Sequence, residues 1–343
     1  MKKVRLILTG VGNLGQRFCK ILFEKSNWIQ EQYGLRFVLV GAVDSGGAAY
    51  NLKGLDLAEI LLLKATGGTV SKYAEGGRPD WTAQALVGFA EADVLLETTP
   101  VNLQQRAEPG LSCIRLAMRH GMHVITPNKG PLALAYRDLC ALAQTQRVQL
   151  RFDGAVAGGL PAINLGMRDM RGSIIQRLDA IPNLATGYVM DLASDGMPWE
   201  EALNRARQEG VLEGDGTWDL EGWDAAAKLV ILANAVLKMP ATLDDVSREG
   251  ILNLSPAKLI AARNRGERYR LLACAELQDE GDYRLSVAPA ALTPQHPFGN
   301  LGRKHMAVRY VTDIYGTLTS IIEEPDPTPS AATMLRDLLD IYS

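Results

Sequence analysis

Short apolar runs alternate with amphipathic stretches along the first 150 residues of the chain. Five of these runs have the length and continuous hydrophobicity of parallel strands buried on both faces: 4–8, 37–43, 92–97, 122–126 and 148–152. Apolar residues at helical spacing lie between them, as in 14–22 and 132–145. This alternation predicts an α/β protein in which residues 1–152 form a Rossmann-type, doubly wound nucleotide domain.

The pattern changes after a glycine-rich crossing at 153–161, which we interpret as a hinge. Amphipathic helices are indicated near 188–192 and 197–210. Strand-like runs separated by turn residues follow the crossing, at 173–181, 269–277, 283–287, 306–312 and 317–322. Residues 153–327 are therefore predicted to form a second, α+β catalytic domain with a mainly antiparallel sheet.

The proline-rich stretch 324–329 reads as a stiff connector to a last helix. Thr328 can cap this helix, Pro329 suits its first turn, and its apolar residues share one face. We expect the helix 328–343 to return to the nucleotide domain.

The amino-acid composition of the chain reduces the number of functions to consider. The 343 residues are 47% hydrophobic and 22% charged, which is ordinary for a folded globular protein. A net charge of −3 lacks the basic excess that nucleic-acid binding needs. The N-terminal apolar run is too short for a leader, no run reaches a membrane-spanning length, and the scattered cysteines indicate reduced thiols. We expect a cytoplasmic protein with no nucleic-acid or membrane partner.

The first strand runs into Gly10-Val-Gly-Asn-Leu-Gly15, followed by a helical pattern. In this setting Gly10 permits a tight turn, Gly12 lets the backbone approach a pyrophosphate, and Gly15 allows close helix–strand packing. The helix N-terminus, at Asn13 and Leu14, attracts the anion. The sequence therefore predicts a dinucleotide site.

Asp44 ends the next buried strand, at the distance where an acidic residue can bond the ribose hydroxyls. Its charge would repel a 2′-phosphate, and the following Ser45-Gly46-Gly47 offers no arginine to bind one. NAD is therefore favoured, while a basic group from elsewhere would permit NADP.

Two further strands end in polar residues. Thr98 and Thr99 follow the run 92–97, and Lys129 follows the run 122–126. Ligands of open α/β sheets lie at the carboxyl ends of the strands, so the two threonines are placed beside the nicotinamide or ribose. Lys129 is expected to point into the cofactor cleft, as a proton carrier or an anion anchor.

The stretch 213–228 gathers charged residues ahead of the apolar segment 229–237. We expect a helix to begin with Asp219 as its N-cap, which places Asp224 and Lys228 one turn apart on one face. Glu213 lies in the preceding loop. Such a group can form a polar reaction centre; the alternative is an ordinary surface Asp/Lys pair.

Three motifs resemble those of the homoserine dehydrogenase family: Val124-Ile-Thr-Pro-Asn-Lys-Gly-Pro-Leu-Ala133, Ala157-Gly-Gly-Leu-Pro161 and Asp219-Leu-Glu-Gly-Trp-Asp-Ala-Ala-Ala-Lys228. The resemblance runs from the glycine turn to the final helix. It is closest to the short form, without the ACT regulatory domain or the fused kinase.

The resemblance implies a homodimer that interconverts L-aspartate 4-semialdehyde and L-homoserine with NAD(P), a step of amino-acid biosynthesis in the aspartate pathway. It implies that Lys228 transfers the proton and that Lys129 lies beside cofactor and substrate. It assigns Thr99 to the cofactor, Asp219 and Asp224 to the catalytic group, and the substrate to Glu213, Asp219 and Thr186. In some members a monovalent cation, Na⁺ or K⁺, lies near the positions that correspond to Asp153, Val156, Gly158 and Leu160.

The chain also departs from the family. Leu184 and Ala185 replace a glycine and a hydroxyl that face the substrate, Val211 replaces a tyrosine, and 325–329 replaces a glycine-rich turn against the cofactor. Loss of a hydroxyl acceptor can cost about 1 to 3 kcal/mol, enough to change substrate preference. The alternatives are therefore a related dehydrogenase for another small hydroxy acid or semialdehyde, an amino-acid dehydrogenase such as an aspartate dehydrogenase, and a non-catalytic NAD-binding protein.

Overall fold

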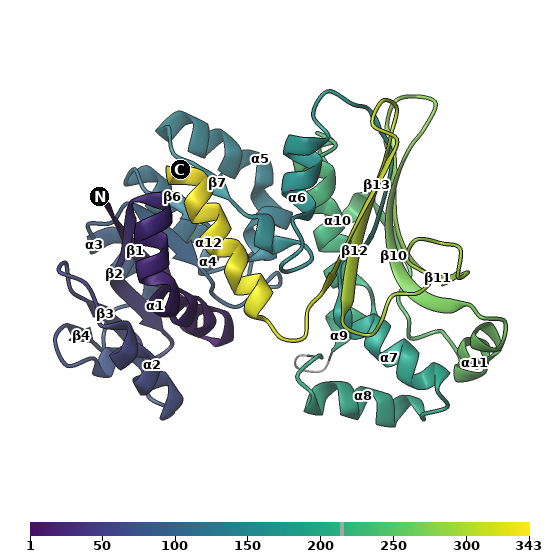
Figure 1. Cartoon of the computed structure of the whole chain (residues 1–343), viewed down its shortest axis with the longest axis horizontal. Helices are drawn as coiled ribbons and strands as arrows, with labels where there is room; N and C mark the ends of the chain where they lie inside the picture. The colour runs from purple at the N-terminus through teal and green to yellow at the C-terminus, as the bar shows by residue number, and fades with distance from the viewer. Residues whose placement is uncertain (213–215) are drawn as a thin grey trace. The chain divides into compact units, whose positions relative to one another are not determined.

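The computed structural model describes residues 1–212 and 216–343. These residues form two compact units (Figure 1). Unit 1 comprises Met1–Gly159 and Asp326–Ser343, and unit 2 comprises Leu160–Pro325. Each is described by itself below.

Within the described residues, unit 1 contains a seven-stranded sheet in the order β4-β3-β2-β1-β5-β6-β7. Its strands are β1 (Lys2–Thr9), β2 (Leu35–Asp44), β3 (Gly47–Tyr50), β4 (Gly77–Arg78), β5 (Val94–Glu97), β6 (His123–Ile125) and β7 (Leu150–Arg151). β1 pairs in parallel with both β2 and β5. The chain thus reverses its direction of travel across the sheet at β1, which confirms the doubly wound prediction. Ligands of such sheets bind at the carboxyl ends of the strands beside this point, here β1 and β5.

The helices of unit 1 pack against this sheet through their apolar faces. They are α1 (Asn13–Tyr33), α2 (Leu57–Ala65), α3 (Ala83–Phe89), α4 (Gly110–Arg119), α5 (Lys129–Gln146) and α12 (Thr328–Tyr342), with short 3₁₀ turns η1 (Val70–Lys72) and η2 (Asp153–Ala155). The strands β3 and β4 were not predicted, because strands of four and two residues leave no readable period. The helices α2 and α3 were not predicted either.

The terminal helix α12 lies beside α1 in Figure 1. Its buried residues Ala331, Met334, Leu335 and Leu338 join one apolar cluster with Leu6, Leu8 and Phe18. A fully buried side chain of this size contributes roughly 1.5 to 3 kcal/mol. The apolar face predicted for the last helix is therefore the face that holds it to unit 1.

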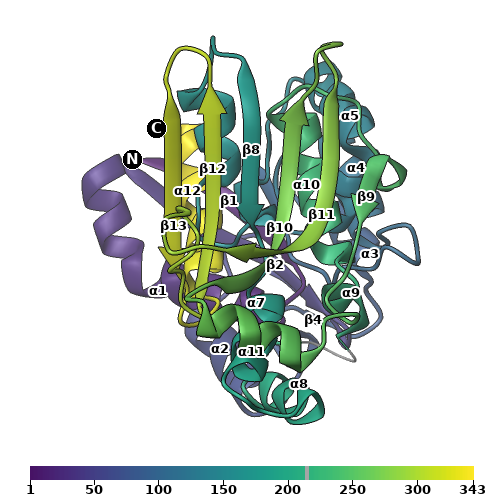
Figure 2. The same ribbon diagram turned by 90° about the vertical axis from the view of Figure 1, so that its right-hand side faces the viewer.

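Unit 2, as far as it is described, contains a six-stranded sheet in the order β13-β12-β8-β10-β11-β9, seen face-on in Figure 2. The strands are β8 (Ile175–Ile181), β9 (Val246–Arg248), β10 (Arg268–Leu277), β11 (Tyr283–Leu292), β12 (His305–Thr312) and β13 (Thr317–Glu323). All neighbours pair antiparallel except β11 and β9. The predicted α+β domain with a mainly antiparallel sheet is confirmed.

β11 is longer than predicted, and it contains Pro289. β9 pairs only with residues 285–287 of β11, so Pro289 lies where β11 is an edge and its missing N–H is tolerated. The sequence pattern alone placed the end of this strand at residue 287.

The helices of unit 2 are α6 (Ala162–Asn164), α7 (Leu184–Ser194), α8 (Trp199–Gln208), α9 (Thr217–Leu220), α10 (Trp223–Ala235) and α11 (Pro256–Asn264). The π-helical turn η3 (Leu165–Asp169) and the 3₁₀ turn η4 (Leu243–Asp245) complete the unit. α10 packs on β10 and β11, and all of its residues except Trp223 and Lys228 are buried.

The predicted N-cap of the helix that carries Lys228 is wrong. Asp219 lies inside the short helix α9, and α10 begins only at Trp223, after Gly222 with φ of 82°. A glycine is favoured there because a left-handed backbone strains other residues. The spacing of Asp224 and Lys228 survives this correction, since both lie on α10.

None of the helices formed by the described residues is long and apolar enough to cross a membrane. All four cysteines are described, and none of them forms a disulfide.

Candidate functional site

The glycine turn of unit 1 has the geometry that the sequence predicted. Gly10 has φ of 94°, and a Cβ atom there would lie 2.4 Å from the carbonyl oxygen of Thr98. A Cβ on Gly15 would lie 2.2 Å from the Gly10 carbonyl oxygen. Gly12 is different, because no described atom lies within 4 Å of a Cβ built on it. Gly10 and Gly15 are thus required by packing, whereas the space at Gly12 is open for a ligand.

The N-terminus of α1 follows this turn. Gly12 is its N-cap, no side chain caps it, and its first turn holds no acidic residue. Its leading N–H groups, which begin at Asn13 and Leu14, are therefore available to an anion. Thr98, at the end of β5, donates from its hydroxyl to the Gly10 carbonyl oxygen at 2.6 Å and so fixes the turn to the neighbouring strand.

Asp44 is the last residue of β2, as predicted, but its carboxylate has partners that the sequence did not indicate. Lys64 Nζ lies 2.6 Å from Oδ2, and Thr69 donates to Oδ1 at 2.6 Å. The backbone N–H groups of Gly46 and Val70 complete four hydrogen bonds from the described chain. Burial raises the pKa of Asp44, but these donors outweigh it and the pKa is lowered. Asp44 is thus a charge that Lys64 largely balances.

Thr99 and Lys129 lie at the ends of neighbouring strands. The Thr99 hydroxyl donates to the buried carboxylate of Glu97, and its carbonyl accepts from Asn128 Nδ2 at 3.2 Å. Asn128 is the N-cap of α5, accepting from the Gly130 N–H at 3.0 Å, and Lys129 is the first residue of that helix. The structure therefore brings Thr99 and the N-terminus of α5, where Lys129 lies, together at the predicted edge of the sheet.

The predicted carboxylates of unit 2 converge on a residue that the sequence reasoning missed. Asn183, the N-cap of α7, donates from Nδ2 to Asp219 Oδ1 at 2.5 Å and to Asp224 Oδ2 at 2.6 Å. Its own Oδ1 accepts from the Thr186 N–H at 3.2 Å. The amide of Asn183 therefore links three helices, α7, α9 and α10, around one polar centre.

Lys228 completes this centre. Its Nζ lies 2.8 Å from Asp224 Oδ2 and donates to the Pro182 carbonyl oxygen at 2.7 Å. The side chains of Lys228 and Asp224 are 15% and 5% exposed, so the pair is not the surface pair of the alternative interpretation. An ammonium has three N–H donors, so these two partners leave one for a substrate oxygen.

The remaining substrate positions are partly described. Thr186 is buried in the first turn of α7, next to buried Ala185, one of the departures from the family pattern. Leu184, the other departure, is the first residue of that helix. Glu213 lies outside the described residues.

Asp153 has a different partner from the one expected of a cation site. Its buried carboxylate accepts from Arg336 of α12. The carbonyl oxygens of Asp153 and Leu160 accept from the Val156 and Ala162 N–H groups. Among the described residues, no group of three His, Cys, Asp or Glu side chains gathers as a metal site. The Asp153 side chain therefore does not fit a cation ligand, and a cation here would depend on backbone carbonyls.

Asp337, beside this ion pair, gives a testable pH dependence. Burial and the nearby Asp153 charge raise its pKa to about 7. When folding raises the pKa of a carboxyl group, the folded state loses stability as the pH rises from the pKa of the unfolded chain to the pKa of the folded chain. For Asp337 this range is from about 4 to about 7. We expect Asp337→Asn to stabilise the chain by roughly 2 to 3 kcal/mol more at pH 8 than at pH 5. Urea unfolding at both pH values measures this; an equal effect at both would contradict it.

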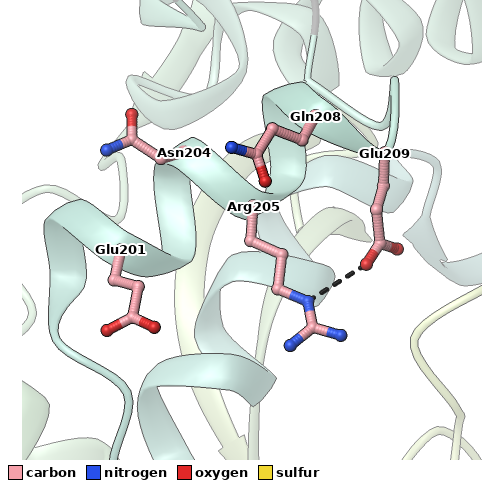
Figure 3. A pocket seen from close by; sticks show the side chains of 5 residues that line it. All are labelled: Glu201, Asn204, Arg205, Gln208 and Glu209. Carbon is pink, nitrogen blue, oxygen red and sulfur yellow. Dashed lines mark hydrogen bonds and ion pairs between the residues drawn. The ribbon is translucent and has the colours of Figure 1, made fainter.

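A surface pocket of about 630 Å³ lies along α8 (Figure 3). Its lining residues are polar and include the ion pair between Arg205 and Glu209, whose Nε and Oε1 atoms are 3.1 Å apart. None of the described residues that line this pocket is a predicted site residue or belongs to the Asn183 centre. The candidate site therefore comprises the strand ends of unit 1 that carry Thr99 and Lys129, together with the Asn183 centre of unit 2. This pocket is not part of it.

A family model described as homoserine dehydrogenase matches residues 161–339. The homoserine dehydrogenase of Methanocaldococcus jannaschii is 33% identical over 98% of this chain and 98% of its own length. An NAD(+)-dependent homoserine dehydrogenase of Pseudomonas canavaninivorans is 32% identical over all of this chain and 97% of its own.

A solved structure of a homoserine dehydrogenase has the same fold. The crystal structure of homoserine dehydrogenase from Thermoplasma acidophilum superposes with a TM-score of 0.85 at 25% identity, covering 98% of each chain. The family model spans more than half of the chain, and the sequence relatives span nearly all of it. The chain therefore belongs to the homoserine dehydrogenase family.

Proposed function

We propose that this chain is an NAD(P)-dependent homoserine dehydrogenase that interconverts L-homoserine and L-aspartate 4-semialdehyde. The observation that carries the proposal is the hydrogen-bonded centre of Asn183, Asp219, Asp224 and Lys228 in a member of this family. A non-catalytic NAD-binding protein would have no use for a largely buried lysine held by Asp224 and the Pro182 carbonyl oxygen.

Unit 1 provides the cofactor half of the reaction. The pyrophosphate binds over Gly12 at the N-terminus of α1, and Thr98 and Thr99 lie on the nicotinamide side. The bound dinucleotide supplies the hydride acceptor or donor. Lys129, at the start of α5, polarises the oxygen of the reacting carbon.

Unit 2 provides the proton. In the oxidation of L-homoserine, the hydride leaves C4 and the amine of Lys228 takes the hydroxyl proton; in the reduction, the Lys228 ammonium returns a proton to the aldehyde oxygen. Asp224 orients Lys228, and Asn183 fixes Asp224 and Asp219 in turn. Asp219, with Glu213 and Thr186, is assigned to the substrate's amino-acid end.

A substrate panel tests the proposal against its alternatives. We expect L-homoserine to reduce NAD⁺ or NADP⁺ and L-aspartate 4-semialdehyde to oxidise the reduced forms, with no dependence on ammonia. Ammonia-dependent oxidation of NADH would identify an amino-acid dehydrogenase. NAD binding without turnover on any member of the panel would identify a binding protein.

Cofactor choice depends on the Asp44–Lys64 pair. The Asp44 carboxylate disfavours a 2′-phosphate, but Lys64 at 2.6 Å balances its charge, so we propose that NAD is preferred and NADP is accepted. Lys64→Met leaves that carboxylate uncompensated. It should raise the ratio of KM for NADP⁺ to KM for NAD⁺ by about tenfold, as measured by initial rates.

The matched control for this variant is Lys53→Met, which removes an exposed lysine of the same unit. It should leave the KM ratio unchanged. An unchanged ratio in Lys64→Met as well would show that the pair does not govern cofactor choice.

Three finer properties complete the proposal. The family resemblance supports a homodimer in the cytoplasm, and sedimentation equilibrium measures the oligomeric state. A monovalent cation would bind through backbone carbonyls of Val156, Gly158 and Leu160, since the Asp153 side chain pairs with Arg336. Activity in NaCl, KCl and choline chloride at equal ionic strength measures any cation requirement.

A further inference from the structure

Glu97 is a buried carboxylate at the reactive edge of unit 1. It is the last residue of β5, its exposed fraction is 0%, and none of the basic side chains described in the structure forms an ion pair with it. A buried carboxylate is costly unless hydrogen bonds satisfy it. The position therefore requires an explanation that apolar packing does not give.

Hydrogen-bond donors from two strand ends satisfy this carboxylate. The Thr99 N–H donates to Oε1 at 2.8 Å and the Thr99 hydroxyl to the same oxygen. The Thr126 hydroxyl, from the end of β6, donates to Oε2 at 2.9 Å. Burial raises the pKa of Glu97, while the donors from Thr99, Thr126 and Asn128 oppose the rise.

The same network reaches the N-terminus of α5. Thr126 Oγ1 accepts from the Asn128 N–H at 3.1 Å, and Asn128 Nδ2 donates to the Thr99 carbonyl oxygen at 3.2 Å. Asn128 also caps α5 through the Gly130 N–H. The carboxylate thus connects the residue after β5 with the cap that precedes Lys129.

The first residue of α4 closes the network on another side. A Cβ on Gly110 would lie 3.0 Å from Asn128 Nδ2, 3.0 Å from Glu97 Oε1 and 3.1 Å from Thr99 Oγ1. Such contacts are tighter than most real Cβ contacts, so a side chain here would displace the network. The absence of a side chain at Gly110 lets α4 approach the carboxylate closely and keeps its geometry fixed.

We propose that Glu97 is a positioning residue, which holds Thr99 and Lys129 in the arrangement that cofactor binding and hydride transfer require. It does so through hydrogen bonds to Thr99 and Thr126 and through Asn128. The inference rests on the proposed function for its kinetic consequence. Its consequence for cofactor binding is independent of the substrate.

Glu97→Gln is the direct test. Glutamine has the size of glutamate, but its NH₂ group replaces one carboxylate oxygen and so faces a hydrogen-bond donor of Thr99 or Thr126. Displacing reacting groups by about 1 Å can cost about 100-fold in rate, so we expect kcat with L-homoserine to fall by about that factor. The dissociation constant for NAD⁺, from calorimetry, should rise about tenfold as a contact at Thr99 is lost.

Two substitutions of Thr126 distinguish a hydrogen-bonding role from a packing role. Thr126→Val keeps the shape and loses the hydroxyl, while Thr126→Ser keeps the hydroxyl. We expect the valine variant to lose about tenfold in kcat and the serine variant to stay within about twofold of the parent. The reverse order would show that Thr126 serves packing and would overturn the proposal. If Glu97→Gln does not fold, this pair decides the question.

The matched control lies at the other end of the same strand. Asp93, just before β5, accepts from the Arg5 N–H at 2.7 Å and pairs with the Arg5 guanidinium. Asp93→Asn should lower the melting temperature without changing kcat or NAD⁺ affinity. Equal kinetic losses in Asp93→Asn and Glu97→Gln would overturn the positioning role. If the parent chain does not turn over L-homoserine, the proposed function fails, and the NAD⁺ dissociation constants of the same variants still decide this inference.

Discussion

Lys228→Met should lower kcat for L-homoserine oxidation by at least about 1,000-fold, because it removes the group that exchanges the proton with the substrate oxygen. The glycine turn and Asp44 belong to unit 1, whereas Lys228 belongs to unit 2. The groups proposed to hold the dinucleotide are unchanged in this variant, so NAD⁺ affinity should remain within about twofold of the parent value. Stopped-flow absorbance at the NADH band, with calorimetric NAD⁺ titration, measures both quantities.

Lys238→Met is the control for this variant. Lys238 follows α10 and donates to the Ala235 carbonyl oxygen, so its removal affects the end of the same helix without touching the Asn183 centre. It should retain parental kcat. Parental turnover in Lys228→Met would reject the lysine as proton carrier, and a joint loss of NAD⁺ binding would indicate a wider structural change.

Gly12→Val should raise the NAD⁺ dissociation constant by at least about 100-fold while the chain stays folded. Its φ of −83° suits any residue, and the described chain leaves 4 Å of open space around a Cβ there. The added Cβ thus meets no described atom beyond its chain neighbours, and the side chain extends into the place proposed for the pyrophosphate. Calorimetry measures the affinity, and circular dichroism with thermal melting measures folding.

Two other glycines calibrate that result. Gly10→Val should unfold or strongly destabilise unit 1, because φ of 94° and the Thr98 carbonyl exclude a side chain. Gly88→Ala, inside α3, meets only Leu116 Cδ2 at 3.7 Å among the described atoms; it should raise stability by up to about 1 kcal/mol and leave NAD⁺ affinity unchanged. Parental NAD⁺ affinity in Gly12→Val would show that the dinucleotide does not bind over the α1 turn.

The features that the sequence predicted correctly are those whose cause is local. The strand, the glycine turn and the helix at 4–22 follow from hydrophobic period and glycine spacing, and α10 keeps Asp224 and Lys228 at one helical turn. The start of that helix was placed wrongly because the backbone angle of Gly222 is not visible in the residue pattern.

The partners that complete each centre come from elsewhere along the chain. Lys64 reaches Asp44 from α2, a helix that was not predicted, and Asn183 reaches Asp224 across 41 residues of sequence. Glu97 ends a strand that the sequence predicted, but its role depends on Thr126 and Asn128, which follow the neighbouring strand β6. No spacing rule connects such residues; only the pairing of strands and packing of helices does.

The relative kcat/KM of L-homoserine and of 4-hydroxybutanoate, its analogue without the 2-amino group, tests the substrate assignment most directly. If Asp219 and its neighbours hold the amino group, L-homoserine should be favoured by at least about 100-fold, the cost of leaving buried polar partners unpaired. Equal values, or a preference for 4-hydroxybutanoate, would show that Leu184 and Ala185 have redirected the site to another substrate.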